Sequence, residues 1–298
     1  TDSNQGHLMN TDQQEIIEAL ITDFQNPSVD IRERSAIQTI DYGELAVEPL
    51  LAALDSEDAN VRHMAVWVLG EIGDIRAVNR LIDALSDTSE TVQEWAARAL
   101  GEMQVAEAID PLIALLQTAQ PSTRHNAAMT LGWIGDETAI EPLRQSLSDE
   151  NALVRGSAAN ALGHLKAGGV VDDLTNLLND EDEWTRSQAA FALGDIGSTA
   201  ATKALLTTLD DDSEWVRFNA ARALGKSKSA EAVERLIQVL REDKSVNVRR
   251  GAAEALGLLR DHRAIPVLES VLQQNSAPSL SSTLLRAVRL IQGRDVGE

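Results

Sequence analysis

Apolar residues recur at a helical spacing along almost the whole chain, in stretches of about eleven residues separated by short polar turns. Residues 139–147, AIEPLRQSL, place apolar side chains on one face of a helix, and the polar turn SDEN follows at 148–151. Such turns supply Asp and Ser caps and put negative charge at the start of the next helix. The pattern therefore predicts an all-helical chain.

The pattern repeats with a period of 31 residues, and a fixed period of this length is typical of stacked-repeat proteins. The spacing between successive Leu-Gly pairs is 31 five times and then 32, for pairs whose glycines are Gly70, Gly101, Gly132, Gly163, Gly194, Gly225 and Gly257. Eight residues before these glycines stand Arg62, Arg124, Arg155, Arg186, Arg217 and Arg249, with Gln93 as the exception.

Each period predicts two helices. The first often carries a proline in its opening turns, where early N–H groups have no helical partner: Pro49, Pro111, Pro142 and Pro266. The second has the form V-R-x-x-A-A-x-A-L-G, and we expect its glycine, often followed by another such as Gly73, to help end it.

Extending this frame gives about nine pairs, the first at residues 12–41 and the last at 263–292. One pair cannot bury its apolar face alone, so neighbouring pairs must stack. The predicted fold is an α-α superhelix, a right-handed α-solenoid that forms a single domain over residues 11–298. Residues 1–10 are expected to be a disordered N-terminal tail.

The aromatic residues lie off the apolar stripe of the second helices. With the Leu-Gly glycine set to zero and 100° per residue, Val, Ala, Leu and Ile fill an arc from about 160° to 260°. The variable positions −10, −7, −6, −3 and +1 span about 20° to 120°. This second arc holds seven of the nine aromatic residues, leaving Phe24 and Tyr42 elsewhere.

Buried aromatic rings stabilise a core by about 2 to 3 kcal/mol each, yet these rings are predicted to face outward. Aromatic side chains mixed with Met and Arg are typical of protein interfaces. The predicted partner-binding set is Trp67, Trp95, Trp133, Trp184, Phe191, Trp215, Phe218, His63, His125, Met129, Arg98 and Arg222. The alternative is packing of each ring against the next repeat, for example at Trp95 or between Trp184 and Trp215.

The charge balance narrows the class of partner. The net charge is −21, and residues 226–298 hold 12 Lys and Arg against 9 Asp and Glu, so the rest of the chain is strongly acidic. This field repels nucleic acid and anionic membranes and favours a basic or neutral partner. The alternative is that the acids keep a long surface solvated. The chain has no cysteine and no long apolar segment, so disulfides and thiolate metal sites are excluded and a cytoplasmic location is expected.

The repeat resembles the short HEAT-like unit of phycobilisome lyases and many prokaryotic scaffold proteins. The resemblance covers residues 12–292 and rests on VRHMAVWVLGEIGDIRAVNRLIDAL (61–85), VRFNAARALG (216–225) and VRRGAAEALG (248–257). It implies that the second helices line the concave side. It also implies a ladder between turns built from an Asp ahead of each Arg: Asp149/Arg155, Asp180/Arg186, Asp211/Arg217 and Asp243/Arg249.

Signatures of catalysis known on related repeats do not occur. None of the five histidines precedes Glu, as the iron-binding dipeptides of deoxyhypusine hydroxylases require, and no H-E-x-x-H helix occurs. Gly225-Lys226-Ser227 fails as a phosphate-binding loop because Ala220 stands at its first glycine. The acidic runs 180–183 and 210–212 are interpreted as solvated helix caps, so neither a metal nor a cofactor is expected.

Two functional hypotheses remain. The first is a non-enzymatic scaffold that binds a protein or peptide in its concave groove. The second, implied by the resemblance, is a subunit like the E/F-type phycobilin lyases, handling a bilin chromophore on a phycobiliprotein. In that case the aromatic rings together with His63, His125, Arg98 and Arg222 would hold the bilin.

Overall fold

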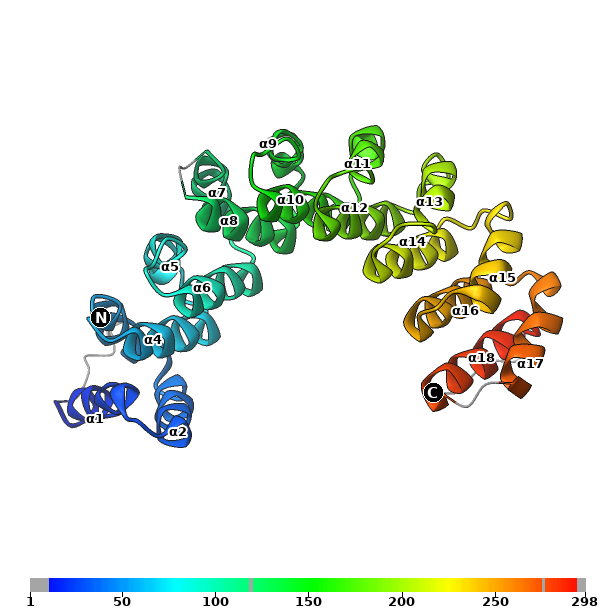
Figure 1. Cartoon of the computed structure of the whole chain (residues 1–298). Helices are drawn as coiled ribbons and strands as arrows, with labels where there is room; N and C mark the ends of the chain where they lie inside the picture. Colours follow the sequence, from blue (N-terminus) through cyan, green and yellow to red (C-terminus); the bar gives the residue numbers. More distant parts are fainter. Residues whose placement is uncertain (1–10, 118–119, 275–276, 294–298) are drawn as a thin grey trace, which may run out of the picture. The chain divides into compact units, whose positions relative to one another are not determined.

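The computed structural model describes residues 11–117, 120–274 and 277–293, and the regular structure of these ranges is helical. Short first helices alternate with longer second helices (Figure 1). The first helices are α1 (Thr11–Thr22), α3 (Val47–Ala53), α5 (Val78–Ala84), α7 (Ile109–Leu115), α9 (Ile140–Ser146), α11 (Val171–Leu177), α13 (Thr202–Thr208), α15 (Ala232–Glu242) and α17 (Ile265–Gln274). The second helices are α2 (Val29–Ile40), α4 (Ala59–Ile72), α6 (Glu90–Met103), α8 (Pro121–Ile134), α10 (Ala152–His164), α12 (Glu183–Ile196), α14 (Glu214–Lys226), α16 (Val246–Leu259) and α18 (Pro278–Ile291). The all-helical fold and its nine pairs are confirmed.

Most first helices are shorter than the eleven residues that the sequence predicts. Six of them have seven residues, and five of these six follow a short 3-10 turn. The side chain of Asp74, for instance, accepts a hydrogen bond from the backbone N–H of Arg76 and holds such a turn. The 3-10 turns are η1 (Asp23–Gln25), η2 (Gly43–Ala46), η3 (Ile75–Ala77), η4 (Ala106–Ala108), η5 (Glu137–Ala139), η6 (Gly168–Val170) and η7 (His262–Ala264).

The chain divides into two compact units at residues 136 and 137. Unit 1 contains α1 to α8 and unit 2 contains α9 to α18. In unit 2 the second helices α10, α12, α14, α16 and α18 pack side by side in that order. Figure 1 shows α9, α11 and α13 as a separate row beside them. The single domain over residues 11–298 stays a prediction, and the predicted tail at 1–10 lies outside the described residues.

The core is built from leucines that recur with the period of the sequence. The leucine of every Leu-Gly pair is at most 1% exposed. The first helices contribute a second set of fully buried leucines with the same spacing, at Leu50, Leu81, Leu112, Leu143, Leu174, Leu205 and Leu236. Burying one leucine stabilises the fold by about 2 kcal/mol. The predicted apolar stripe is therefore confirmed as the core.

The Leu-Gly glycines lie inside the second helices and do not end them, which corrects the sequence prediction. They allow close approach of the next second helix, because a β-carbon on Gly163 would lie 2.7 Å from the Cα of Ala192. The same contact joins Gly194 to Ala223, at 2.8 Å. Where a second glycine follows three residues later, as at Gly73, that residue ends the helix in the left-handed region, with φ 70°.

An Asp-Arg ladder ties successive repeats together. Arg186 donates from Nε and Nη2 to the carboxylate of Asp211 in the next repeat, at 2.7 and 3.0 Å. Its Nη1 donates to the backbone oxygen of Asp180, the Asp ahead of it, at 2.8 Å. The pairs Arg62–Asp87, Arg155–Asp180 and Arg217–Asp243 repeat this ion pair. The ladder differs from the prediction in its carboxylates, because each side-chain partner comes from the following repeat.

Hydrogen bonding keeps the ladder carboxylates ionised. Burial opposes ionisation of Asp211, but the hydrogen bonds from Arg186 and from the backbone N–H of Ser213 outweigh it. The pKa of Asp211 is therefore lowered from its ordinary value. The same causes lower the pKa of Asp180 and that of Asp87. Each carboxylate thus links two repeats as a charged group.

Candidate functional site

We define the second-helix face as the side chains at the variable positions −10, −7, −6, −3 and +1 of the second helices. All seven aromatic residues of this face are at least partly exposed, whereas Phe24 of η1 is fully buried. Trp215 is 60% exposed and Trp133 is 40% exposed. The other five rings are half-buried. The rings are therefore neither core residues nor sealed between repeats.

Four predicted site residues of unit 1 form one cluster on α4 and α6. The Trp95 ring lies 5.3 Å from that of His63 and 5.9 Å from that of Trp67, centroid to centroid. The guanidinium of Arg98 lies 5.0 Å from the Trp95 centroid, on the cationic side of a cation-π pair. Glu102 pairs with Arg98 at 2.8 Å. These contacts fix the rings while leaving part of each exposed.

His63 is an uncharged member of this cluster. Its pKa is lowered, first by burial and then by the positive charge of Arg32. The imidazole is therefore neutral at pH 7, which suits its contact with the Trp95 ring. Its Nε2 atom is buried and has no hydrogen-bond partner among the described residues.

The remaining predicted residues of unit 1 lie on α8. Trp133 packs across Gly101 of α6, where a β-carbon would come within 2.9 Å of the Trp133 ring. His125 and Met129 of the same helix are half-buried. Trp133 thus makes a contact between repeats and still exposes part of its ring.

Unit 2 repeats the ring-over-glycine contact at Trp184. A β-carbon on Gly156 of α10 would meet the indole of Trp184 at 2.1 Å, so a larger residue there would displace the ring. Phe191 of α12 lies edge-on to His164, with centroids 5.9 Å apart. The ammonium of Lys226 lies 5.4 Å from the Phe191 centroid and pairs with Asp195.

Phe218 of α14 lies close to two guanidinium groups. Arg222 lies 5.5 Å and Arg250 of α16 lies 5.8 Å from its ring centroid. The ring also covers Gly251, where a β-carbon would come within 2.9 Å of it. Trp215 opens the same helix, and its indole has no hydrogen bond or ring contact with another described residue.

Polar side chains connect neighbouring second helices on this face. Asn160 donates to Gln188 at 2.9 Å, and Asn219 donates to Ser187 at 2.7 Å. In unit 1 Asn126 donates to Gln93 at 3.0 Å. Sequence reasoning missed these polar contacts together with His164, Lys226 and Arg250. A usable signal was present, because the glycines at 156 and 251 mark where a ring from the neighbouring helix lies.

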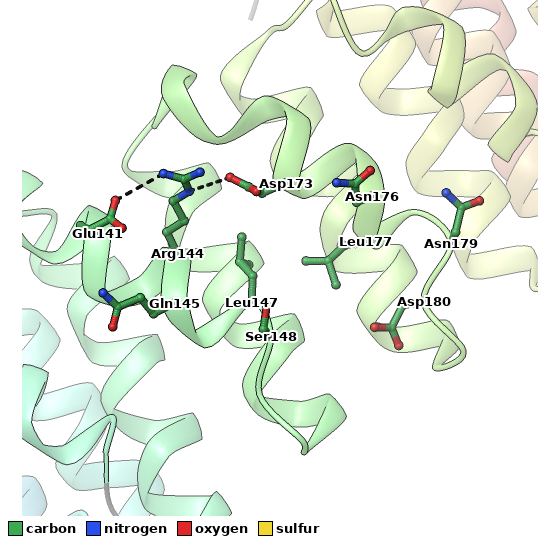
Figure 2. Close-up of a pocket in the computed structure, with 10 residues that line it drawn as sticks. All are labelled: Glu141, Arg144, Gln145, Leu147, Ser148, Asp173, Asn176, Leu177, Asn179 and Asp180. Atoms are coloured by element: carbon green, nitrogen blue, oxygen red, sulfur yellow. Dashed lines mark hydrogen bonds and ion pairs between the residues drawn. The ribbon is translucent and has the colours of Figure 1, made fainter.

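The opposite side of the repeats carries polar clefts between first helices. Figure 2 shows one between α9 and α11, a cleft of about 430 Å³ in which Arg144 pairs with Asp173. The rest of its lining consists largely of carboxylate, amide and hydroxyl side chains. In unit 1 a cleft of about 460 Å³ is lined by Asp55, Arg80 and Asp83. Neither cleft contains an aromatic residue.

No group of three or more His, Asp or Glu side chains within residues 11–117, 120–274 and 277–293 is placed to hold a metal ion. Over the same ranges, none of the helices combines the length and apolar character needed to cross a membrane.

Comparison with known families identifies the chain. The model of HEAT repeats matches four overlapping segments, at residues 14–92, 78–163, 140–218 and 202–289. The chain therefore belongs to the HEAT-repeat family. A search of curated proteins gives no match.

Solved structures share the fold. YibA of Escherichia coli is 20% identical over 89% of this chain and 99% of its own, with a TM-score of 0.62. Human deoxyhypusine hydroxylase, solved with glycerol, is 25% identical over 86% of this chain and 98% of its own, with a TM-score of 0.40. The complex of CpcE and CpcF of phycocyanin lyase from Nostoc sp. PCC7120 is 25% identical over 83% and 94%, with a TM-score of 0.42. The likeness to YibA shows the fold alone, and the two lower TM-scores support no statement about function.

Proposed function

We propose that this protein is a non-enzymatic scaffold that binds a protein or peptide partner on its second-helix face. The observation that carries the proposal is the placement of seven aromatic rings there, all at least partly exposed, in a chain whose repeat core is built from Leu, Val and Ala. Trp, Met and Arg are enriched in protein interfaces, and this face combines all three.

The exposed rings represent binding energy that folding leaves unused. A tryptophan offers roughly 250 Å² of surface, and Trp215 leaves 60% of its surface in water. Covering that area contributes about 4 kcal/mol at roughly 25 cal/mol per Å². A few such rings therefore supply enough energy for specific recognition.

The rings are also held in place before a partner arrives. Trp95 contacts His63 and Trp67 on one helix and Arg98 on its own. Trp184 rests over Gly156. Ordering a free side chain on binding costs about 0.5 to 1.5 kcal/mol, and fixed rings avoid most of that loss. Ring packing between repeats, the alternative raised by the sequence, is thus compatible with a binding role.

A binding role fits the polar groups of this face better than a catalytic one. Glu71 accepts a hydrogen bond from the Trp67 indole at 3.2 Å. Glu102 pairs with Arg98, and Glu254 pairs with Arg222 at 3.5 Å. These carboxylates support rings and cations. A nucleophile would need an adjacent base instead.

Trp215 and Ile75 provide a matched pair for testing the face. Both are more than half exposed, Trp215 on the second-helix face and Ile75 on a 3-10 turn before the first helix α5. A photo-crosslinking residue is introduced at each position in turn, and the labelled chain is irradiated in a lysate of the source organism. Mass spectrometry of the cross-linked product then identifies the partner. We expect Trp215→Ala to weaken binding of that purified partner at least about tenfold, since most of the about 4 kcal/mol of contact is removed. Ile75→Ala is expected to leave binding unchanged.

The result can also contradict the proposal. Binding that Ile75→Ala weakens and Trp215→Ala does not would place the partner on the first helices. The melting temperature of both variants serves as the control for folding. The bilin-handling alternative has a separate outcome, a shift of the absorption spectrum when the purified chain is mixed with phycocyanobilin.

A further inference from the structure

We infer that the second-helix face of α14, α16 and α18 binds a partner segment that presents a carboxylate next to an aliphatic side chain. The inference rests on the proposed function and specifies the chemistry of the partner in unit 2. It differs from the expectation drawn from net charge alone, which favours a basic or neutral partner.

Cations gather locally on this part of a strongly acidic protein. Helices α12 to α18 place four cations on the second-helix face, at Arg222, Lys226, Arg250 and Arg286. The anions at the corresponding positions are Asp195 and Glu254. The local balance is therefore positive, although the chain as a whole has a net charge of −21. Local charges within a few ångströms decide which groups a site accepts.

Two of these cations have no carboxylate of their own. Lys226 pairs with Asp195, and Arg222 approaches Glu254 at 3.5 Å. Over the described residues Arg250 forms no ion pair, and its buried Nε has no hydrogen-bond partner. Arg286 of α18 likewise forms no ion pair within these ranges. A chain with 47 acidic residues had many ways to pair them. The guanidinium groups of Arg250 and Arg286 can therefore donate bidentate hydrogen bonds to a carboxylate of a partner.

The Phe218 ring positions Arg250. Arg222 and Arg250 lie on neighbouring helices and both approach this ring, at 5.5 and 5.8 Å from its centroid. A guanidinium over an aromatic ring keeps its in-plane N–H donors directed sideways, toward an incoming acceptor. Phe218, Arg222 and Arg250 thus form a fixed surface that is cationic and partly apolar, which we call the platform.

A small apolar pocket lies beside the platform, between α16 and α18. Its volume is about 160 Å³, and its apolar lining comes from Leu258, Ala287 and Leu290. Leu258 is 53% exposed. Glu254 and Arg286 border the pocket, and Glu254 also contacts Arg222. Sites for small molecules usually measure about 300 to 1,000 Å³, so this pocket fits one aliphatic side chain.

The platform and the pocket together define the occupant. An acidic peptide segment that inserts a leucine or isoleucine into the pocket places neighbouring carboxylates near Arg286 and Arg250. Nucleic acid offers phosphates but no aliphatic side chain for the pocket. Charge complementarity therefore selects an acidic segment of a protein.

Two synthetic peptides test the inference on the full chain. Both consist of Gly and Ser around a central Leu, which is flanked by Glu in one peptide and by Lys in the other. We expect fluorescence anisotropy to give at least about tenfold tighter binding of the Glu peptide, since one or two charge-assisted contacts distinguish the two. Arg250→Gln with Arg286→Gln removes this preference, and Leu258→Ser weakens the Glu peptide about fivefold.

Arg80→Gln is the control, because Arg80 lies on the first helix α5 of the other unit and is not part of the second-helix face. It should leave binding of the Glu peptide unchanged. Equal or tighter binding of the Lys peptide overturns the inference while leaving a binding role for the face. Failure of both peptides also overturns it, and the Trp215 experiment then decides the proposed function separately. Tighter binding of a labelled single-stranded oligonucleotide than of the Glu peptide would contradict an acidic protein partner.

Discussion

Replacing Gly163 by valine is expected to lower the free energy of unfolding by about 3 kcal/mol, because overpacking of a close contact costs roughly 1 to 3 kcal/mol and sometimes more. A β-carbon at Gly163 would lie 2.7 Å from the Cα of Ala192, and backbone cannot move aside as a flexible side chain does. Helices α10 and α12 must separate to admit it. Urea unfolding followed by far-ultraviolet circular dichroism measures the loss.

Gly168→Val is the control for this substitution. Gly168 lies in η6, and a β-carbon there would have no atom within 4 Å. The same change should therefore alter stability by about 0.5 kcal/mol or less. Equal losses at the two positions would show that the Leu-Gly glycines do not set the spacing of the repeats.

Replacing Asp211 by alanine is expected to cost about 3 kcal/mol at pH 7, since it leaves the guanidinium of a largely buried ion pair without its carboxylate. The side chains of Arg186 and Asp211 are 16% and 12% exposed. Asp173→Ala removes an ion pair that also spans two repeats, with Arg144, but the two side chains are 47% and 35% exposed (Figure 2). Exposed pairs contribute about 0 to 1 kcal/mol, so Asp173→Ala should change the free energy of unfolding very little.

The effect at Asp211 has a defined pH dependence. The pKa of this carboxyl is lowered in the folded protein, so its stabilising contribution is complete above its ordinary pKa of about 4. That contribution disappears as the pH falls through the lowered value. The deficit of Asp211→Ala relative to the wild type should therefore be constant between pH 7 and pH 5 and shrink below about pH 4. A deficit that grows on acidification would contradict the assignment.

The 31-residue period was sufficient to predict the fold. It places leucines such as Leu69 and Leu100 in one stripe, and both are fully buried. What it could not give is the register between neighbouring repeats, because a helical wheel describes one helix at a time. The resemblance to HEAT-like repeats pairs Arg186 with Asp180 ahead of it, whereas the carboxylate that binds Arg186 is that of Asp211 in the next repeat.

The candidate site was predictable to a similar extent. The wheel placed the rings outside the core, and the exposure of Trp215 and Trp133 agrees. The wheel could not predict contacts between helices. Trp184 lies over Gly156, and Arg250 lies beside Phe218, because of the way in which two helices pack. Whether the predicted residues bind a partner stays a prediction.

We propose that a partner covers the exposed rings of the second helices. Hydroxyl-radical footprinting of the purified chain with and without its cross-linked partner tests this most directly, because tryptophan oxidation reports solvent contact at each ring. We expect strong protection of Trp215 or Trp133 in the complex and unchanged oxidation of Ile75. Both tryptophans oxidised as fast in the complex as in the free chain, with protection confined to the first helices, would contradict it.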